Sequence, residues 1–309
     1  MMRRHDIRIG GSAVSKTRIS GPVLAHLLGT IVEGTTRVLR YRLEGRSKAP
    51  GSLPAWLRPA AGFDVIASTD PGVVHLEARS LADTLPDRFR QCDLFQTVDP
   101  EKSALDLFED GLEDALRGNH DSDLFDEGLV QTFAEFRQVL GEGGLDRIEI
   151  VNGRTVPVST DGLGRVEELR RSTPRPAHVR LAGRLDAIRY SDKMFTLVLE
   201  TGLELRGVAA DVDEGSLKSL WGRPALVVGT AHFRPSGALA RVDAERVEPA
   251  SDRELALWQA APVSFATEGQ ELRNLRQPQG KRSGINAIIG QWPGDETEEE
   301  LRAALESLS

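Results

Sequence analysis

The segment between residues 177 and 249 constrains the fold most, because strand patterns and turns follow one another there in a regular order. Apolar and polar residues alternate, and the alternation predicts β-strands at 178–189, 194–199, 203–208, 225–233 and 238–247. A short helix is expected at 212–220, between the third and fourth strands. Gly183 lies inside the first strand and predicts a β-bulge there.

Three strands, a helix and two further strands form an order that resembles the OB-fold, a small barrel whose members commonly bind oligonucleotides on one face. An SH3-like small barrel is the alternative. Single-stranded nucleic acid is held by aromatic rings above a basic groove. The residues of the predicted barrel suited to that task are Arg184, Arg189, Tyr190, Arg206, Phe233 and Arg234.

Residues 1–172 predict a mixed domain of helices and strands. Two helices with apolar stripes, one beginning at Asp99-Pro100 and one capped by Ser122, predict a helical hairpin. Asn152-Gly153 between two apolar runs predicts a β-hairpin. From residue 22 we expect a helix to about Gly34 and then a strand at 35–43, with one continuous helix as the alternative. The fold class is therefore α+β.

Changes in composition divide the chain further. Pro174-Arg175-Pro176 predicts a boundary between a mixed domain at 1–172 and the barrel at 177–250. A capping box, Ser251 to Glu254, opens a helix, and the polar stretch after it makes 251–284 a helix and linker. Residues 285–309 are expected to form a flexible docking tail.

Composition limits the class of protein. The net charge of −8 argues against a general affinity for nucleic acid, and Cys92 is the single cysteine, which is typical of a reducing cytoplasm. No apolar run is long enough to span a membrane, and no secretory signal is expected at the start. Abundant Ala, Arg and Gly with little Lys is typical of a bacterial source. Residues 1–60 are basic and residues 61–130 are acidic. Such a difference in charge suggests surfaces for partners, and the alternative is that the two segments face each other or water.

Motifs for catalysis are weak. The acidic string from Gly118 to Asp126 carries metal-friendly side chains, but it lies where one helix ends and the next needs acidic groups in its first turn. The string from Gly10 to Thr17 lacks the glycine that precedes the lysine of a phosphate-binding loop. We therefore expect no enzyme, no cofactor and no metal. An enzyme would need Asp121, Asp123 and Asp126 to converge in one pocket.

The C-terminal segment carries the strongest binding signal. Its large apolar side chains stand in a polar setting, and Thr297 to Glu300 forms a capping box for a short acidic helix. We expect this tail to bind a partner protein through Ile288, Ile289, Trp292, Pro293, Leu301 and Leu305. The alternative is that the tail folds back onto its own first domain, for instance near Arg37 to Arg42.

The string from Gly290 to Leu301, with Trp292-Pro293-Gly294-Asp295-Glu296-Thr297 at its centre, resembles the C-termini of small bacterial antitoxins encoded beside PIN-domain ribonuclease toxins. The resemblance covers about 25 of the 309 residues. It implies a non-catalytic protein that neutralises a toxin ribonuclease. The chain departs from the antitoxin pattern because no familiar DNA-binding head is visible. The alternative function is single-stranded nucleic-acid binding by the OB-like barrel.

Overall fold

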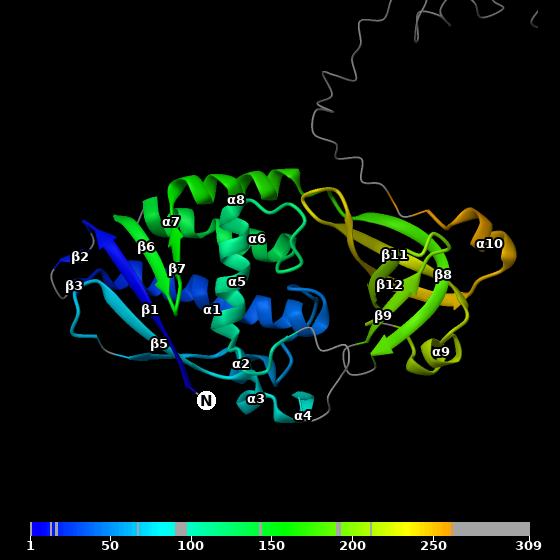
Figure 1. Ribbon diagram of the computed structural model, residues 1–309, viewed down its shortest axis with the longest axis horizontal. Coiled ribbons are helices and arrows are strands. Elements are labelled where there is room, and N and C mark those ends of the chain that lie inside the picture. Colours follow the sequence, from blue (N-terminus) through cyan, green and yellow to red (C-terminus); the bar gives the residue numbers. More distant parts are fainter. Residues whose placement is uncertain are drawn as a thin grey trace, which may run out of the picture. The chain divides into compact units, whose positions relative to one another are not determined.

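The computed structural model describes residues 2–12, 14–15, 18–66, 68–89, 98–141, 144–189, 193–210, 212–260 and 262. Helices and sheets combine in it, which confirms the α+β class (Figure 1). Cys92, Tyr190 and every residue predicted for the docking tail lie outside the described residues.

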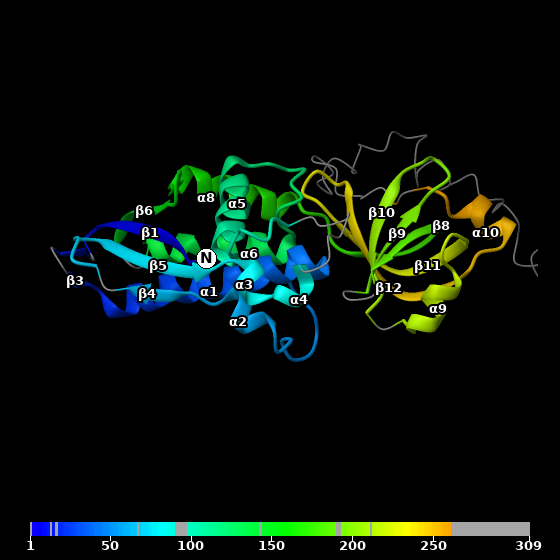
Figure 2. The ribbon, with the colours of Figure 1, turned by 60° about the horizontal axis from the view of Figure 1, so that its bottom comes forward.

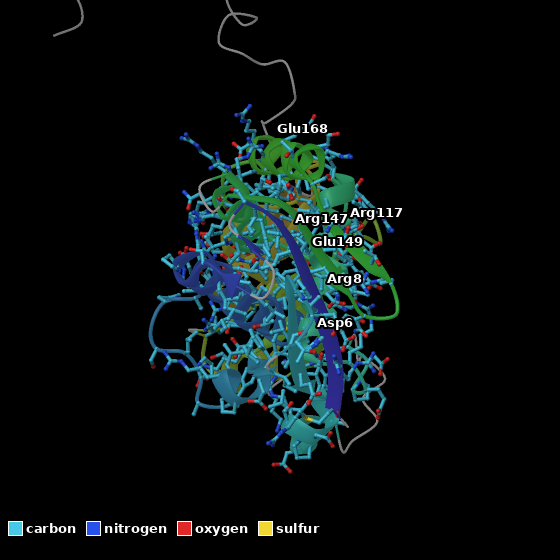
Figure 3. The ribbon with its side chains drawn as sticks, turned by 90° about the vertical axis from the view of Figure 1, so that its left-hand side faces the viewer. Asp6, Arg8, Arg117, Arg147, Glu149 and Glu168 are labelled. Carbon is cyan, nitrogen blue, oxygen red and sulfur yellow. The ribbon has the colours of Figure 1, made fainter. Side chains whose placement is uncertain are left out.

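An antiparallel five-stranded sheet organises the first part of the chain. Its strands, in order across the sheet, are β4 (Asp64–Ile66), β5 (Val73–Arg79), β1 (Met2–Gly11), β6 (Leu145–Val151) and β7 (Thr155–Val158). The short strands β2 (Val14–Ser15) and β3 (Arg18–Ile19) pair separately. Alternation along β1 buries Ile7 and Ile9. The opposite face carries charged side chains, among them Asp6, Arg8 and Glu149 (Figure 3).

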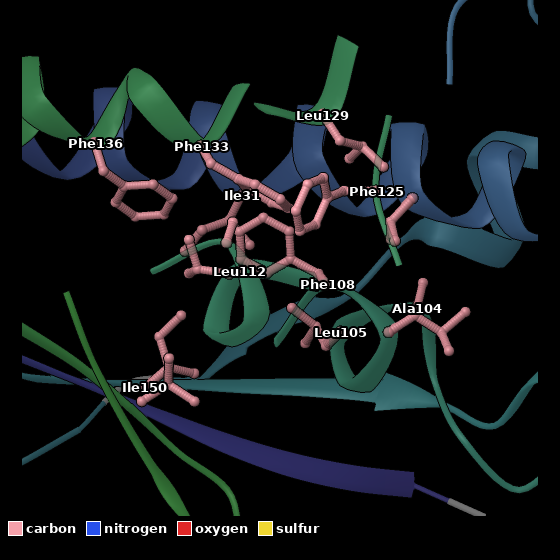
Figure 4. Packing of buried hydrophobic residues seen from close by; sticks show 14 of the residues in the cluster. Ile31, Ala104, Leu105, Phe108, Leu112, Phe125, Leu129, Phe133, Phe136 and Ile150 are labelled. Atoms are coloured by element: carbon pink, nitrogen blue, oxygen red, sulfur yellow. The ribbon is translucent and has the colours of Figure 1, made fainter. Parts of the chain in front are cut away.

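Helices cover the buried face of this sheet. The longer ones are α1 (Gly21–Glu44), α5 (Ala104–Arg117), α6 (Glu127–Ala134), α7 (Phe136–Gly141) and α8 (Thr160–Ser172), and the short ones are α2 (Leu57–Ala61), α3 (Leu81–Thr84) and α4 (Pro86–Phe89). The ring of Phe108 on α5 packs 5.8 Å from Phe133 and 6.2 Å from Phe136, centroid to centroid. These rings form the centre of the larger hydrophobic core, with α5 packed between the sheet and α1 (Figure 4).

The prediction that a strand begins after Gly34 was wrong, because α1 continues without a break to Glu44. Gly34 does not end the helix. It lets α1 pack closely against Phe108, because a Cβ atom added at Gly34 would lie 2.2 Å from Phe108 Cε2. Val38 and Leu39 continue the buried helical face beyond it. The helix ends at Gly45, whose φ of 74° is the left-handed conformation that glycine tolerates.

Two predicted helix starts are displaced. Helix α5 begins after Ser103, which forms a capping box with Asp106, and not at Asp99. Helix α6 begins after Asp126, whose carboxylate accepts the backbone N–H of Leu129, and not after Ser122. In both cases the capping residue is the one closer in sequence to the buried residues of the helix. The hairpin at Asn152-Gly153 is confirmed by β6 and β7.

Residues 177–249 form a closed five-stranded barrel, consistent with the OB-like prediction. The strands are β8 (Ala177–Arg189), β9 (Met194–Val198), β10 (Glu204–Val208), β11 (Pro224–Phe233) and β12 (Leu239–Pro249), with α9 (Glu214–Ser219) between the third and fourth (Figure 2). Parallel pairing of β10 with β12 closes the ring. The barrel has its own hydrophobic core, built around Leu185, Ala225 and Val227.

The bulge predicted at Gly183 is found instead between Leu185 and Ala187, where the register of β8 with β9 shifts. Gly183 serves a close approach of strands, since a Cβ atom there would lie 2.6 Å from Val198 O. Helix α10 (Asp252–Leu257) follows the barrel and begins with the predicted capping box of Ser251 and Glu254. Among the described residues, no helix combines the length and apolarity that crossing a membrane requires.

Candidate functional site

A groove of about 770 Å³ lies beside α1. One wall is α1, and the other is the segment from Ser47 to Phe63, which includes α2. The residues that line it are Gly29, Val32, Glu33, Thr36, Arg37, Arg40, Ser47, Lys48, Ala49, Leu53, Arg58, Ala61, Gly62 and Phe63.

The sequence of α1 leaves this groove open. The helix buries Leu27 and Ile31 in the core, and Gly29, Val32 and Thr36 recur at helical spacing on the groove side. A Cβ atom added at Gly29 would meet no neighbouring atom within 4 Å. Val32 is 51% exposed and Leu53 across from it is 41% exposed. Val32 and Leu53 therefore form an exposed apolar strip along the groove.

The rim of the groove is basic. Arg37, Lys48 and Arg58 line it together with the carboxylate of Glu33, while the fourth cation, Arg40, is buried and lies 2.8 Å from the carboxylate of Glu44. This contrasts with the net charge of −8 for the whole chain. Arg37 is held in place, because it pairs with Glu33 and donates a hydrogen bond to the carbonyl of Gly128 at 3.1 Å. The Glu33 carboxylate thus offsets the charge of Arg37, and Lys48 and Arg58 supply the positive charge beside the apolar surface.

A buried polar network joins β1 to α5. His5 Nδ1 lies 2.5 Å from Glu109 Oε1, and both side chains are almost fully buried. The Asp106 carboxylate accepts the Ser103 N–H at 2.7 Å and the Asn152 amide at 2.8 Å. Ligand atoms of His5, Asp106 and Glu109 lie within 4.8 Å of one another, so this trio could hold a metal ion.

The partners of these groups favour a structural role. Burial raises the pKa of Glu109, and the opposing hydrogen bond from His5 only partly offsets it. Burial acts in the same sense on Asp106, but hydrogen bonds from Ser103 outweigh it and lower the pKa of that carboxyl. A carboxylate with its hydrogen bonds satisfied gains less from a metal ion. We therefore interpret the network as the polar attachment of α5 to β1.

None of the three acids of the string 118–126 lines the groove beside α1 or a smaller hollow on the barrel, and each contacts the barrel. Asp126 caps α6 and also lies 3.2 Å from Arg241 Nη1 of the barrel. Asp123 pairs with Arg234, and the backbone carbonyl of Asp121 accepts a hydrogen bond from the same guanidinium at 3.1 Å. The predicted capping role is found for Asp126, and the contacts with the barrel were not foreseen.

The residues predicted for nucleic-acid binding are spread over the barrel. Arg184 is exposed and lies 2.9 Å from the carboxylate of Asp186, while Phe233 is buried in the barrel. Arg189 ends β8. Arg206 and Arg234 are brought together, since both line a hollow of about 210 Å³ with Thr196, Glu204, Leu205, Leu239 and Ala240.

Sequence reasoning missed the groove. Its basic side chains were noticed in the Arg37–Arg42 region, but the second wall comes from a proline-containing loop whose path the sequence does not fix. Because the second half of α1 was predicted as a strand, the stripe from Gly29 to Arg40 was not recognised as one surface. A continuous helical reading of α1 is the signal that could have revealed it.

No protein-family model, curated protein or solved structure matches this chain. The groove beside α1, the buried network and the hollow on the barrel are therefore the features of the described residues that bear on function.

Proposed function

We propose that this chain is a non-catalytic protein-binding protein whose body binds a partner through the groove beside α1. The observation that carries the proposal is the exposed apolar floor of Val32 and Leu53 under a rim of cations. Exposed apolar surface of this kind marks interaction sites. The only carboxylate of the lining, Glu33, is paired with Arg37 and is therefore poorly placed to act as a general base.

The chemistry of the groove selects the kind of partner. A helix lying in a groove places apolar side chains at i, i+3, i+4 and i+7 against the floor. Carboxylates beside that stripe would face Arg37, Lys48 and Arg58 at the rim. An acidic amphipathic helix is therefore the segment that the groove suits best.

A matched pair of glycine variants tests the groove. Gly29→Trp places a large side chain in it from a position where no atom lies within 4 Å of the added Cβ. Gly164→Trp places the same side chain on the equally open surface of α8, away from the groove lining. The probe is a fluorescent helical peptide with leucines at i, i+4 and i+7 and glutamates between them, titrated by anisotropy.

We expect the Gly29 variant to weaken peptide binding at least about tenfold, equivalent to ~1.4 kcal/mol, and the Gly164 variant to leave it unchanged. A peptide with lysine in place of glutamate should not bind. Equal binding by both variants, or no binding by the unaltered chain, would refute the groove as a docking site.

The partner engaged by residues 285–309 is proposed to be a toxin ribonuclease of the PIN-domain class. The resemblance of the string around Trp292-Pro293 to antitoxin tails supports this. Deleting residues 285–309 should abolish complex formation with a PIN-domain toxin that binds the full chain, while circular dichroism shows that the body stays folded. Recovery of the same toxin by the truncated chain would remove this proposal.

A second candidate function is binding of single-stranded nucleic acid by the barrel. The hollow that contains Arg206 and Arg234 favours it, because it lies on β9, β10 and the start of β12. OB-like barrels use the face of the second and third strands for such ligands. Titration of a short oligonucleotide at low salt tests it, and a flat titration would count against it.

A further inference from the structure

The turn between α5 and α6 makes four polar contacts with the barrel. Arg234 donates one hydrogen bond to the Asp121 carbonyl at 3.1 Å and pairs with the Asp123 carboxylate. The Ser236 N–H donates to the His120 carbonyl at 3.1 Å. Arg241 Nη1 lies 3.2 Å from Asp126 Oδ2. One acidic turn is thus attached to one region of the barrel.

That region is where barrels of this type take their ligands. Arg234 and Ser236 lie between the fourth and fifth strands, and this loop, with the face of the second and third strands, is the usual ligand surface of OB-like barrels. The first domain also reaches the second and third strands themselves. A Cβ atom added at Gly45 would lie 3.2 Å from Met194 Cε on β9 and 3.3 Å from Val208 Cγ2 on β10.

The contacts resemble those that a nucleic-acid backbone would make. Arg234 uses Nη2 for the Asp123 carboxylate and Nη1 for the Asp121 carbonyl, so each prong of its guanidinium meets one oxygen, as it would on a phosphate. Arg234 holds the carboxylate of Asp123 and at the same time lines the hollow that contains the exposed Arg206. A phosphate bound in this hollow would compete with Asp123 for one guanidinium.

We infer that the ligand face of the barrel is a binding site for single-stranded nucleic acid that the chain's own acidic turn, Asn119 to Asp126, occupies in cis. The turn blocks the face by presenting a carboxylate and backbone carbonyls where phosphates would lie. This inference rests on the second candidate function and is independent of the groove beside α1.

The test uses the full chain with two exposed carboxylates neutralised, Asp121→Asn and Asp123→Asn together. Asp126 is left intact because it caps α6 and also accepts the Ser47 N–H at 3.0 Å, so its loss would disturb the fold. The matched control neutralises two exposed acids on the first sheet, Asp64→Asn and Asp146→Asn, and makes the same change in net charge. The probe is a fluorescein-labelled fifteen-residue thymidine oligonucleotide, titrated at several salt concentrations.

We expect the turn variant to bind the oligonucleotide at least tenfold more tightly than the unaltered chain and the control variant. Affinity should fall with salt, by about 0.7 log units per phosphate contact for each log unit of salt. Adding Arg206→Ala to the turn variant should remove the gain, since Arg206 lines the hollow beside Arg234.

Three results would overturn the inference. The first is an equal gain in the control variant, which would mean a general charge effect. The second is a gain that survives Arg206→Ala. The third is no oligonucleotide binding by the turn variant, with or without a lower unfolding midpoint, because the turn would then be a structural attachment only. Binding of the acidic peptide to the groove would be unaffected in every case, so the two proposals fail separately.

Discussion

Two glycines on α1 make a sharp test of the packing described above, because identical substitutions should have opposite effects. At Gly29 an added methyl group meets nothing within 4 Å. At Gly34, five residues further along, the same methyl group would lie 2.2 Å from Cε2 and 2.6 Å from Cδ2 of Phe108. Phe108 is fully buried, and its ring is held by Phe133 and Phe136.

The magnitudes follow from these surroundings. Gly29→Ala should stabilise the first domain by about 0.8–1 kcal/mol, the intrinsic preference of a helix for alanine. Gly34→Ala has the same gain, but overpacking a rigid core costs ~1–3 kcal/mol. We expect a net loss of up to about 2 kcal/mol at Gly34, and a difference of ~1–3 kcal/mol between the two variants, which is the cost of overpacking.

Urea denaturation followed by circular dichroism at a helical wavelength measures both variants, since most helices belong to the first domain. Phe108→Leu in the Gly34→Ala background should recover part of the loss and reveal a coupling of about 1 kcal/mol. If Gly34→Ala stabilises the chain as much as Gly29→Ala does, the close contact between α1 and α5 is wrong.

Three further predictions concern groups with defined partners. Burial alone would raise the pKa of Asp243, but His232 and Arg241 outweigh burial and lower the pKa to about 2. This carboxylate therefore stabilises the fold above its ordinary pKa, and the stabilisation is lost as the pH falls from about 4 to 2. The stability difference between the unaltered chain and Asp243→Asn, measured in urea, should be ~2 kcal/mol at pH 6 and vanish near pH 2; a constant difference would contradict the pairing. Burial, with nearby carboxylates, raises the pKa of Tyr41 to about 12, so phenolate absorbance of a variant whose other tyrosine is phenylalanine should titrate near that pH and not near 10. Ser103→Ala removes the cap of α5 and should cost about 1–2 kcal/mol in urea denaturation, with no loss expected if the capping box is unimportant.

Much of the barrel could be predicted because its signals are local. Alternation with a period of two and turns rich in glycine depend only on neighbouring residues, and the five strands fall within a few residues of their expected bounds. The helix between β10 and β11 was also anticipated. Local propensity and tertiary packing agree in this segment, so the sequence pattern was sufficient.

Gly34 shows where local reasoning fails. A glycine followed by Thr35 and Val38 reads as a helix end and a strand, since threonine and valine favour strands. The deciding contact is with Phe108, which lies 74 residues further along the chain. Burial against α5 overrides the weak preference of these residues, and no neighbouring residue in the sequence announces that contact.

In the candidate sites, too, the local patterns were predictable and the long-range contacts were not. The cap at Asp126 belongs to a local pattern, whereas its second bond, to Arg241, joins residues 115 positions apart. The predicted basic set on the barrel contained Arg234, but its pairing with Asp123 depends on the packing of the turn between α5 and α6 against the barrel. Side chains suited to a task were recognisable from the sequence, and their partners were not.

The parallel pairing of β10 with β12 has a consequence for how this chain can associate. Each barrel strand has a hydrogen-bonded neighbour on both sides, so a foreign strand finds no open backbone there. The first sheet differs, because it stops at β4 and β7. Strand β4 is only three residues long, and Val65 and Ile66 on it are 51% and 39% exposed. Within the part of the chain that the structure describes, an assembly that grows by extending a sheet therefore finds open edges on the first sheet and none on the barrel.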